Sequence, residues 1–212
     1  MTVAQRQSVA LWRRMLRVQV PSVTHMKTKT LALDKSTLLS INTFLPLIAF
    51  AIPLFISGPQ ILTGSLVNCF LFLSSNYSSK KAQYAIIILP SIGALLNGVI
   101  FGKFTPFLAY FLPFIWMGNY ILVRTFTLFA RHPDEGRGLD SKLIPWIPAF
   151  AGMTLSALLK SVFLFVFVFV FFKLSIVPRV FLTAMGIFQF ITAIIGGILF
   201  LGINKIVNKK LT

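Results

Sequence analysis

Acidic side chains are scarce in this sequence, which has 4 Asp and Glu residues against 20 Lys and Arg residues in 212. None of the four lies within a long apolar segment, so we exclude a proton or sodium relay built on carboxylates, as many pumps use. The components of paired-carboxylate hydrolysis and of a Ser-His-Asp triad are missing as well. We therefore predict that the chain has no catalytic residues and is not an enzyme.

Cysteine and histidine are also rare. The single cysteine, Cys69, lies in an apolar segment, which excludes an intramolecular disulfide and a thiolate metal cluster. Of the two histidines, His132 lies near Asp134 and Glu135 but has no second histidine close to it, so a zinc site lacks its ligands. The glycine patterns that bind nucleotides are not found. We predict no metal and no cofactor.

Apolar residues dominate what is present. Hydrophobic residues make up 57% of the chain and charged residues 11%, against about one quarter charged residues in soluble domains. The mean hydropathy is +0.87, which predicts an integral membrane protein with the lipid bilayer as its first partner. The net charge of +16 would favour nucleic acid in a soluble protein. Here the basic residues lie between and beyond the apolar segments, as in cytoplasmic loops of membrane proteins, so we predict no nucleic-acid binding.

Six apolar segments predict the fold class, an all-α polytopic bundle of about six transmembrane helices. They cover residues 36–56, 60–73, 84–101, 105–129, 155–174 and 181–203. Lys160 near the start of the fifth segment and Lys173 at its end are expected to bracket the hydrocarbon. Alternate loops differ strongly in their number of Lys and Arg residues, and the basic side includes both ends of the chain. The positive-inside rule then places both termini in the cytoplasm, in the cell membrane.

The first 25 residues differ from the single transmembrane domain expected for residues 26–212. They contain four arginines and no acidic residue, which is typical of a basic amphipathic helix on a membrane surface. We favour another hypothesis. Residues 4–8 and 17–21 can be back-translated into sequences that resemble the D-arm and T-arm of a transfer RNA gene, in that order. The leader would then be a translated tRNA gene and the true start Met26, which the coding DNA can test.

A second unusual segment covers residues 131–154 and contains three of the four acidic residues. Its ending, PAFAGMT, resembles peptides encoded by dispersed palindromic repeats in bacterial genomes. We predict a repeat-derived insert in a loop, where insertions are tolerated. A degenerating gene would also explain a translated leader together with a repeat insert.

Neutral amides within the apolar segments are the candidate binding residues. An unpaired amide in hydrocarbon costs several kcal/mol, so these side chains should face the bundle interior or a polar cavity. A few hydrogen-bonding groups in an apolar wall are typical of a small-molecule pocket. The alternative is that each amide only bonds a neighbouring helix. The predicted substrate-binding residues are Gln60, Asn68, Asn97 and Asn119, with Gln189 as a further amide.

Small residues recur at four-residue spacing at Ala94, Gly98 and Gly102. Such a row lets helices approach closely in lipid, so we predict that it packs against another helix.

Three stretches, GPQILTGSLVN, LPSIGALLNG and LPFIWMGNYILV, resemble the substrate-specific (S) components of energy-coupling factor (ECF) vitamin transporters. The resemblance is best over residues 36–123. It implies a subunit that binds a micronutrient from outside and delivers it by reorienting against a transmembrane coupling subunit driven by two ATPases. It also implies that a small-residue face, here the row from Ala94 to Gly102, docks on that partner. The alternative is a structural or accessory membrane protein. A cavity of at least a few hundred Å³ where the amides converge would favour transport.

Overall fold

We describe a computed structural model of the chain. It describes residues 35–56, 59–101, 105–131 and 146–210, all within one compact unit. The predicted leader and most of the predicted insert lie outside these residues. The described residues form helices and contain no strand, which confirms the all-α fold class. The helices are α2 Lys35–Phe55, α3 Gln60–Tyr77, α4 Lys80–Phe101, α5 Thr105–Arg131, α6 Trp146–Lys173, α7 Val180–Met185 and α8 Ile187–Lys210.

Helix α6 begins earlier than the sequence predicts. Residues 146–154, which we assigned to the loop insert, form its first turns. They are apolar, and Pro148 lies in the first turn, where the missing backbone N–H costs nothing. Met153 is buried, and a Cβ added at Gly152 would lie 2.7 Å from Cβ of Phe129 on α5. This part of the segment therefore belongs to the packed bundle.

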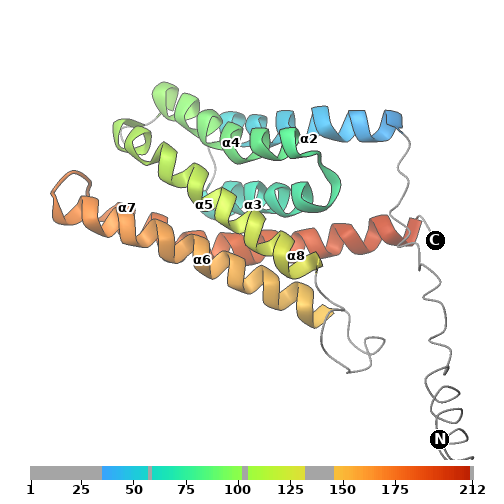
Figure 1. The fold of residues 1–212 in the computed structure, drawn as a ribbon. Helices are drawn as coiled ribbons and strands as arrows, with labels where there is room; N and C mark the ends of the chain where they lie inside the picture. The colour runs from blue at the N-terminus through green and yellow to red at the C-terminus, as the bar shows by residue number, and fades with distance from the viewer. Residues whose placement is uncertain (1–34, 57–58, 102–104, 132–145, 211–212) are drawn as a thin grey trace, which may run out of the picture. The chain divides into compact units, whose positions relative to one another are not determined.

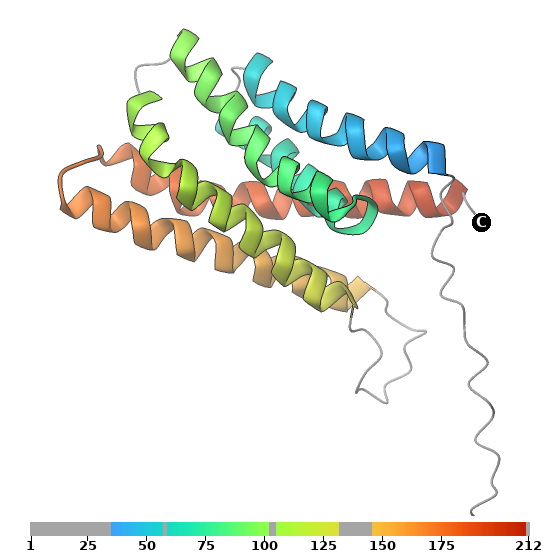
Figure 2. The ribbon, with the colours of Figure 1, turned by 45° about the horizontal axis from the view of Figure 1, so that its top comes forward.

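The helices pack mainly in three pairs, α2 with α4, α3 with α8, and α5 with α6. Figure 2 shows α2 beside α4 and α5 beside α6. Two glycines permit the first two contacts. A Cβ at Gly93 would lie 2.5 Å from the carbonyl oxygen of Phe50, and one at Gly196 would lie 2.5 Å from that of Ser65. Because backbone atoms cannot turn aside, these positions require glycine.

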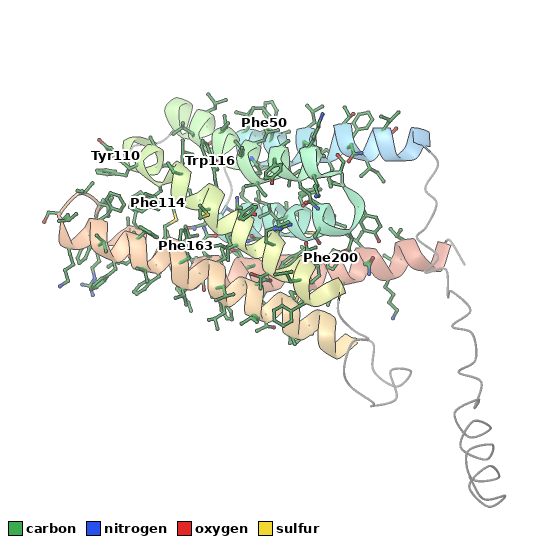
Figure 3. All side chains as sticks on the ribbon, viewed as in Figure 1. Phe50, Tyr110, Phe114, Trp116, Phe163 and Phe200 are labelled. Atoms are coloured by element: carbon green, nitrogen blue, oxygen red, sulfur yellow. The ribbon has the colours of Figure 1, made fainter. Side chains whose placement is uncertain are left out.

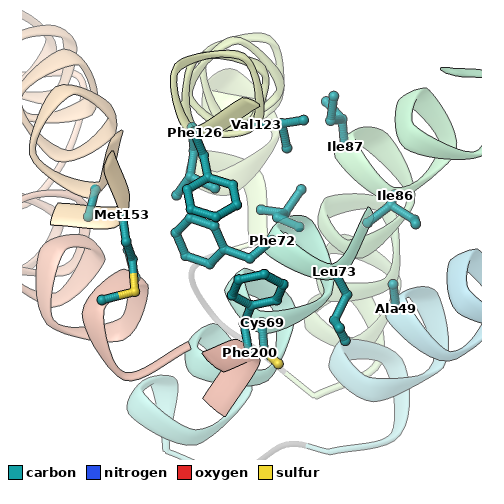
Figure 4. Packing of buried hydrophobic residues seen from close by; sticks show 14 residues of the cluster. Ala49, Cys69, Phe72, Leu73, Ile86, Ile87, Val123, Phe126, Met153 and Phe200 are labelled. Carbon is teal, nitrogen blue, oxygen red and sulfur yellow. The ribbon is translucent and has the colours of Figure 1, made fainter. Parts of the chain in front are cut away.

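A dense aromatic core fills one end of the bundle. The rings of Phe72 and Phe126 meet edge to face with centroids 4.9 Å apart, and Phe200 packs beside both (Figure 4). Cys69 and Met153 belong to the same cluster. This core lies toward the end where α3 turns into α4. At the opposite end α4 ends, α5 begins and α6 ends (Figure 1).

A second apolar cluster joins α5, α6 and α7. Phenylalanine side chains cover the facing surfaces of α5 and α6, where Phe114 and Phe163 are labelled in Figure 3. The rings of Phe114 and Phe167 are 4.4 Å apart between centroids, and Phe111 stacks on Phe181 of α7. This cluster packs α7 against the first half of α5 and the last turns of α6.

Three helical stretches are long and apolar enough to cross a membrane, namely Phe107–Phe129, Phe150–Lys173 and Val180–Val207, and Leu39–Phe55 is a shorter apolar helix. The Val and Phe alternation on α6 forms a helix, as predicted, and not a strand. Its outward side chains include Val162 and Val166, each 51% exposed. An apolar outer surface of this kind suits a lipid environment.

Candidate functional site

A partly open cavity of about 380 Å³ lies between the helices. Most of its described residues come from the first half of α3, the second half of α4, the first part of α5, α7 and the start of α8, and α2 and the middle of α6 contribute one residue each. The cavity therefore occupies the end of the bundle opposite the α3–α4 turn. Its polar lining consists of Gln60, Thr63, Asn68, Ser91, Asn119, Lys160 and Gln189. Its apolar lining includes Pro53, Val67, Pro90, Leu108, Ile115, Phe181 and Met185.

The most unusual lining residue is Lys160, which is only 3% exposed. Its Nζ donates a hydrogen bond of 2.6 Å to Oδ1 of Asn68. We predicted this lysine at the edge of the hydrocarbon, and that prediction is wrong. Because α6 begins at Trp146, Lys160 lies about 21 Å along the helix at 1.5 Å per residue, near its middle. A charge flanked by apolar residues on both sides along the sequence was the signal that could have revealed it.

Asn68 links three helices through both ends of its amide. Its Nδ2 donates to Oγ1 of Thr192 at 3.2 Å, and the threonine hydroxyl donates to the backbone carbonyl of Gln189 at 3.2 Å. A lysine ammonium can only donate, so the amide oxygen must face Lys160 and the amide nitrogen Thr192. The network holds α3, α6 and α8 in one arrangement and fixes the direction of the Lys160 side chain.

Gln60 and Asn119 line the cavity and also join helices. Nε2 of Gln60 donates to the carbonyl of Ala184 on α7 at 2.8 Å. Nδ2 of Asn119 donates to the carbonyl of Ile87 on α4 at 3.0 Å. Pro90 lacks the N–H that would bond the carbonyl of Ile86, and the bond from Asn119 reaches the next carbonyl along the chain. Asn119 thus joins α5 to α4 at the proline turn.

Asn97 is not among the described residues that line the cavity. Its Nδ2 donates to the carbonyl of Leu54 at 2.7 Å. Leu54 lies in the last turn of α2, where carbonyls have no partner within the helix. Asn97 therefore fastens α4 to the end of α2, in line with the alternative that we stated for each amide.

The predicted small-residue row consists of Ala94, Gly98 and Gly102. Ala94 and Gly98 line the cavity, while Gly102 lies outside the described residues. The close helix contact on α4 is made by Gly93, one position from the predicted row. Ala94 and Gly98, which we predicted to pack against another helix, border the cavity instead.

Ser91 and Gln189 also belong to the polar lining of the cavity. Ser91 Oγ accepts a 2.6 Å hydrogen bond from Nε1 of Trp116 and donates to the carbonyl of Ile88. The side-chain amide of Gln189 has no hydrogen-bond partner among the described residues. Within the same residues no group of three or more His, Cys, Asp or Glu side chains lies close enough to hold a metal ion. The described lining suits the binding of a small molecule through hydrogen bonds and one cationic group.

Protein-family models, curated proteins and solved structures were all compared with this chain, and none matched it. The class of protein is described by its helices and its cavity alone. The described residues form a helical bundle with apolar helices long enough to span a membrane and a partly polar cavity between them.

Proposed function

We propose that this chain is the substrate-binding subunit of an uptake system for a vitamin-like micronutrient, working with a separate ATP-driven coupling module. The observation that carries the proposal is the cavity, whose volume lies within the usual range of ligand pockets, about 300 to 1,000 Å³. Three of the four predicted binding amides, Gln60, Asn68 and Asn119, line it. The cavity and these three amides support a binding subunit, although Asn97 does not line the cavity.

The distribution of basic residues supports an outward-facing cavity. In the sequence, the segments that follow α4 and α6, taken with the last residue of α6, contain Lys103, Lys173 and Arg179. The segments that follow α3 and α5, taken with the adjoining helix ends and both terminal parts of the chain, contain many more, namely Lys27, Lys29, Lys35, Lys80, Lys81, Arg131, Arg137, Lys142, Lys205, Lys209 and Lys210. By the positive-inside rule the richer set faces the cytoplasm, and α4 and α6 end beside the cavity. We therefore propose six membrane-spanning segments, cytoplasmic termini and a cavity that receives its ligand from outside.

The accessory role is the second candidate function, and one observation favours it. Each of the four amides donates a hydrogen bond to a neighbouring helix. Amides used only in this way would hold the bundle together without a ligand. The cavity is the feature that this role does not explain.

Ligand capture is tested by purifying the full chain from membranes in detergent and analysing co-purifying small molecules by mass spectrometry. Ala94→Phe fills the cavity from α4, and Leu96→Phe adds an aromatic ring at an exposed position of the same helix. We expect one small molecule with the wild type and with Leu96→Phe, but not with Ala94→Phe. A wild-type protein that remains empty, even after exposure to a cell extract, would favour the accessory role.

The coupling module is tested separately by affinity purification from the native membrane after mild crosslinking. We expect one further transmembrane protein and an ATPase at constant ratio to this chain. Recovery of an enzyme without an ATPase would support the accessory role instead.

A further inference from the structure

We propose that the ligand of this cavity is an apolar molecule with a single carboxylate, and that Lys160 binds the carboxylate. This inference rests on the proposed function and names the chemical class of the substrate. It is carried by a buried cationic side chain that borders the cavity.

Lys160 has no negatively charged partner among the described residues. The part of the chain that the structure describes contains no carboxylate side chain, since Asp34, Asp134, Glu135 and Asp140 all lie outside it. Lys160 also lies about 20 Å from each end of α6 at 1.5 Å per residue. A buried lysine keeps its charge only when an anionic partner offsets the cost of burying an ammonium. A ligand carboxylate would provide that partner.

The side chain of Lys160 is held in one direction by Asn68. Asn68 accepts one hydrogen bond from Nζ of Lys160, and an ammonium has three donors. Because Thr192 holds the amide of Asn68, the lysine is fixed beside the cavity with donors left for a ligand. The amide of Gln189, which has no partner among the described residues, lines the same cavity and offers a further donor.

The number of charged groups at the cavity limits the charge of its ligand. Lys160 is the only charged residue among the described residues that line the cavity. One ammonium balances one carboxylate, whereas a phosphate monoester brings about 1.5 to 2 negative charges at neutral pH. The rest of the wall is formed mostly by apolar side chains such as Val67, Ile115 and Phe181. The site therefore favours an apolar monocarboxylate over a phosphorylated or sugar-like molecule.

The test compares Lys160→Met with Lys173→Met in the full-length protein. Both variants remove one positive charge from α6, but Lys173 is exposed at the end of the helix. We expect the co-purifying molecule of the wild type to be a monocarboxylate by mass spectrometry. Since truncating one partner of a buried charge pair is costly, its affinity should fall about thirtyfold or more in Lys160→Met and stay unchanged in Lys173→Met.

A second measurement needs no variant and uses defined probes. Arylalkyl monocarboxylates and their primary amides, beginning with 4-phenylbutyrate and 4-phenylbutyramide, are added to the wild type. Thermal unfolding and Trp116 fluorescence are then recorded, since Trp116 bonds the lining residue Ser91. We expect carboxylates to raise the unfolding temperature more than their matched amides. A panel in which no carboxylate exceeds its amide would overturn the inference, even if Lys160→Met fails to fold.

The outcomes separate this inference from the proposed function. A neutral or cationic co-purifying molecule, or an anion held equally by Lys160→Met, would refute the carboxylate site and leave ligand capture standing. A wild type that binds nothing in either measurement would refute both. A monocarboxylate lost only from Lys160→Met would support both.

Discussion

Lys160 on α6 and Asn68 on α3 are joined by a buried hydrogen bond of 2.6 Å from Nζ to Oδ1. Ninety-two positions separate the two residues in the sequence, and both border the cavity. The same hydrogen bond therefore joins α3 to α6 and orients the Lys160 amine at the cavity.

We expect Asn68→Leu to destabilise the protein by about 2 to 4 kcal/mol, because it removes the acceptor of a buried ammonium. The double variant with Lys160→Met should cost less than Asn68→Leu alone, since it leaves no buried amine without an acceptor, and the Thr192 hydroxyl keeps its bond to the carbonyl of Gln189. Unfolding by SDS in mixed micelles measures the change in the free energy of unfolding for Asn68→Leu, for Lys160→Met and for the double variant. Asn76→Leu, an exposed position on the same helix, is the control. Free energies that simply add would show that the two residues are not coupled.

Gly196→Ala should destabilise the contact of α3 with α8. The added methyl group would lie 2.5 Å from the carbonyl oxygen of Ser65 and 2.7 Å from the backbone nitrogen of Cys69. Overpacking of this kind costs about 1 to 3 kcal/mol. Gly202→Ala, on the same helix with no atom within 4 Å of the added Cβ, should leave the unfolding temperature unchanged. Equal effects of the two substitutions would contradict the close helix contact.

Met153→Ala tests whether the end of the predicted insert has become part of the bundle. Met153 is fully buried, and its truncation should cost about 2 to 5 kcal/mol through lost burial and a new cavity. Met117→Ala, at a position that is 51% exposed, should cost far less. A Met153→Ala protein as stable as the wild type would mean that the segment is only tolerated and contributes no packing.

The orientation in the membrane can be tested with single cysteines in a Cys69→Ala background. Ser175→Cys lies just beyond α6 at the cavity end, and Asn76→Cys lies at the opposite end of the bundle, and both positions are exposed. An impermeant maleimide added to intact cells should label Ser175→Cys and not Asn76→Cys. Detergent treatment should make both reactive. The reverse pattern would place the cavity on the cytoplasmic side and contradict capture from outside.

The sequence determined where most helices lie. Apolar segments bounded by turn residues predicted α2, α3, α4 and α5 within a few residues, because a helix in lipid must be continuous and apolar. The same reasoning expected the amides to face inward, since an unpaired amide in hydrocarbon is costly; Asn68 and Asn119 are buried, whereas Gln60 is exposed. The sequence predicted one continuous helix over residues 181–203. The structure instead has two helices, α7 and α8, which are separated at Gly186.

Only the tertiary structure decided what those side chains meet. Asn68 and Asn119 reach the cavity while Asn97 bonds the end of α2, although all three are amides in similar apolar surroundings. Lys160 lies near the middle of α6 because apolar residues before 155 belong to this helix, and it is buried because neighbouring helices pack around it. A sequence fixes the periodicity and polarity of each helix, but the depth and neighbours of a residue depend on how far the helix extends and which helices pack against it.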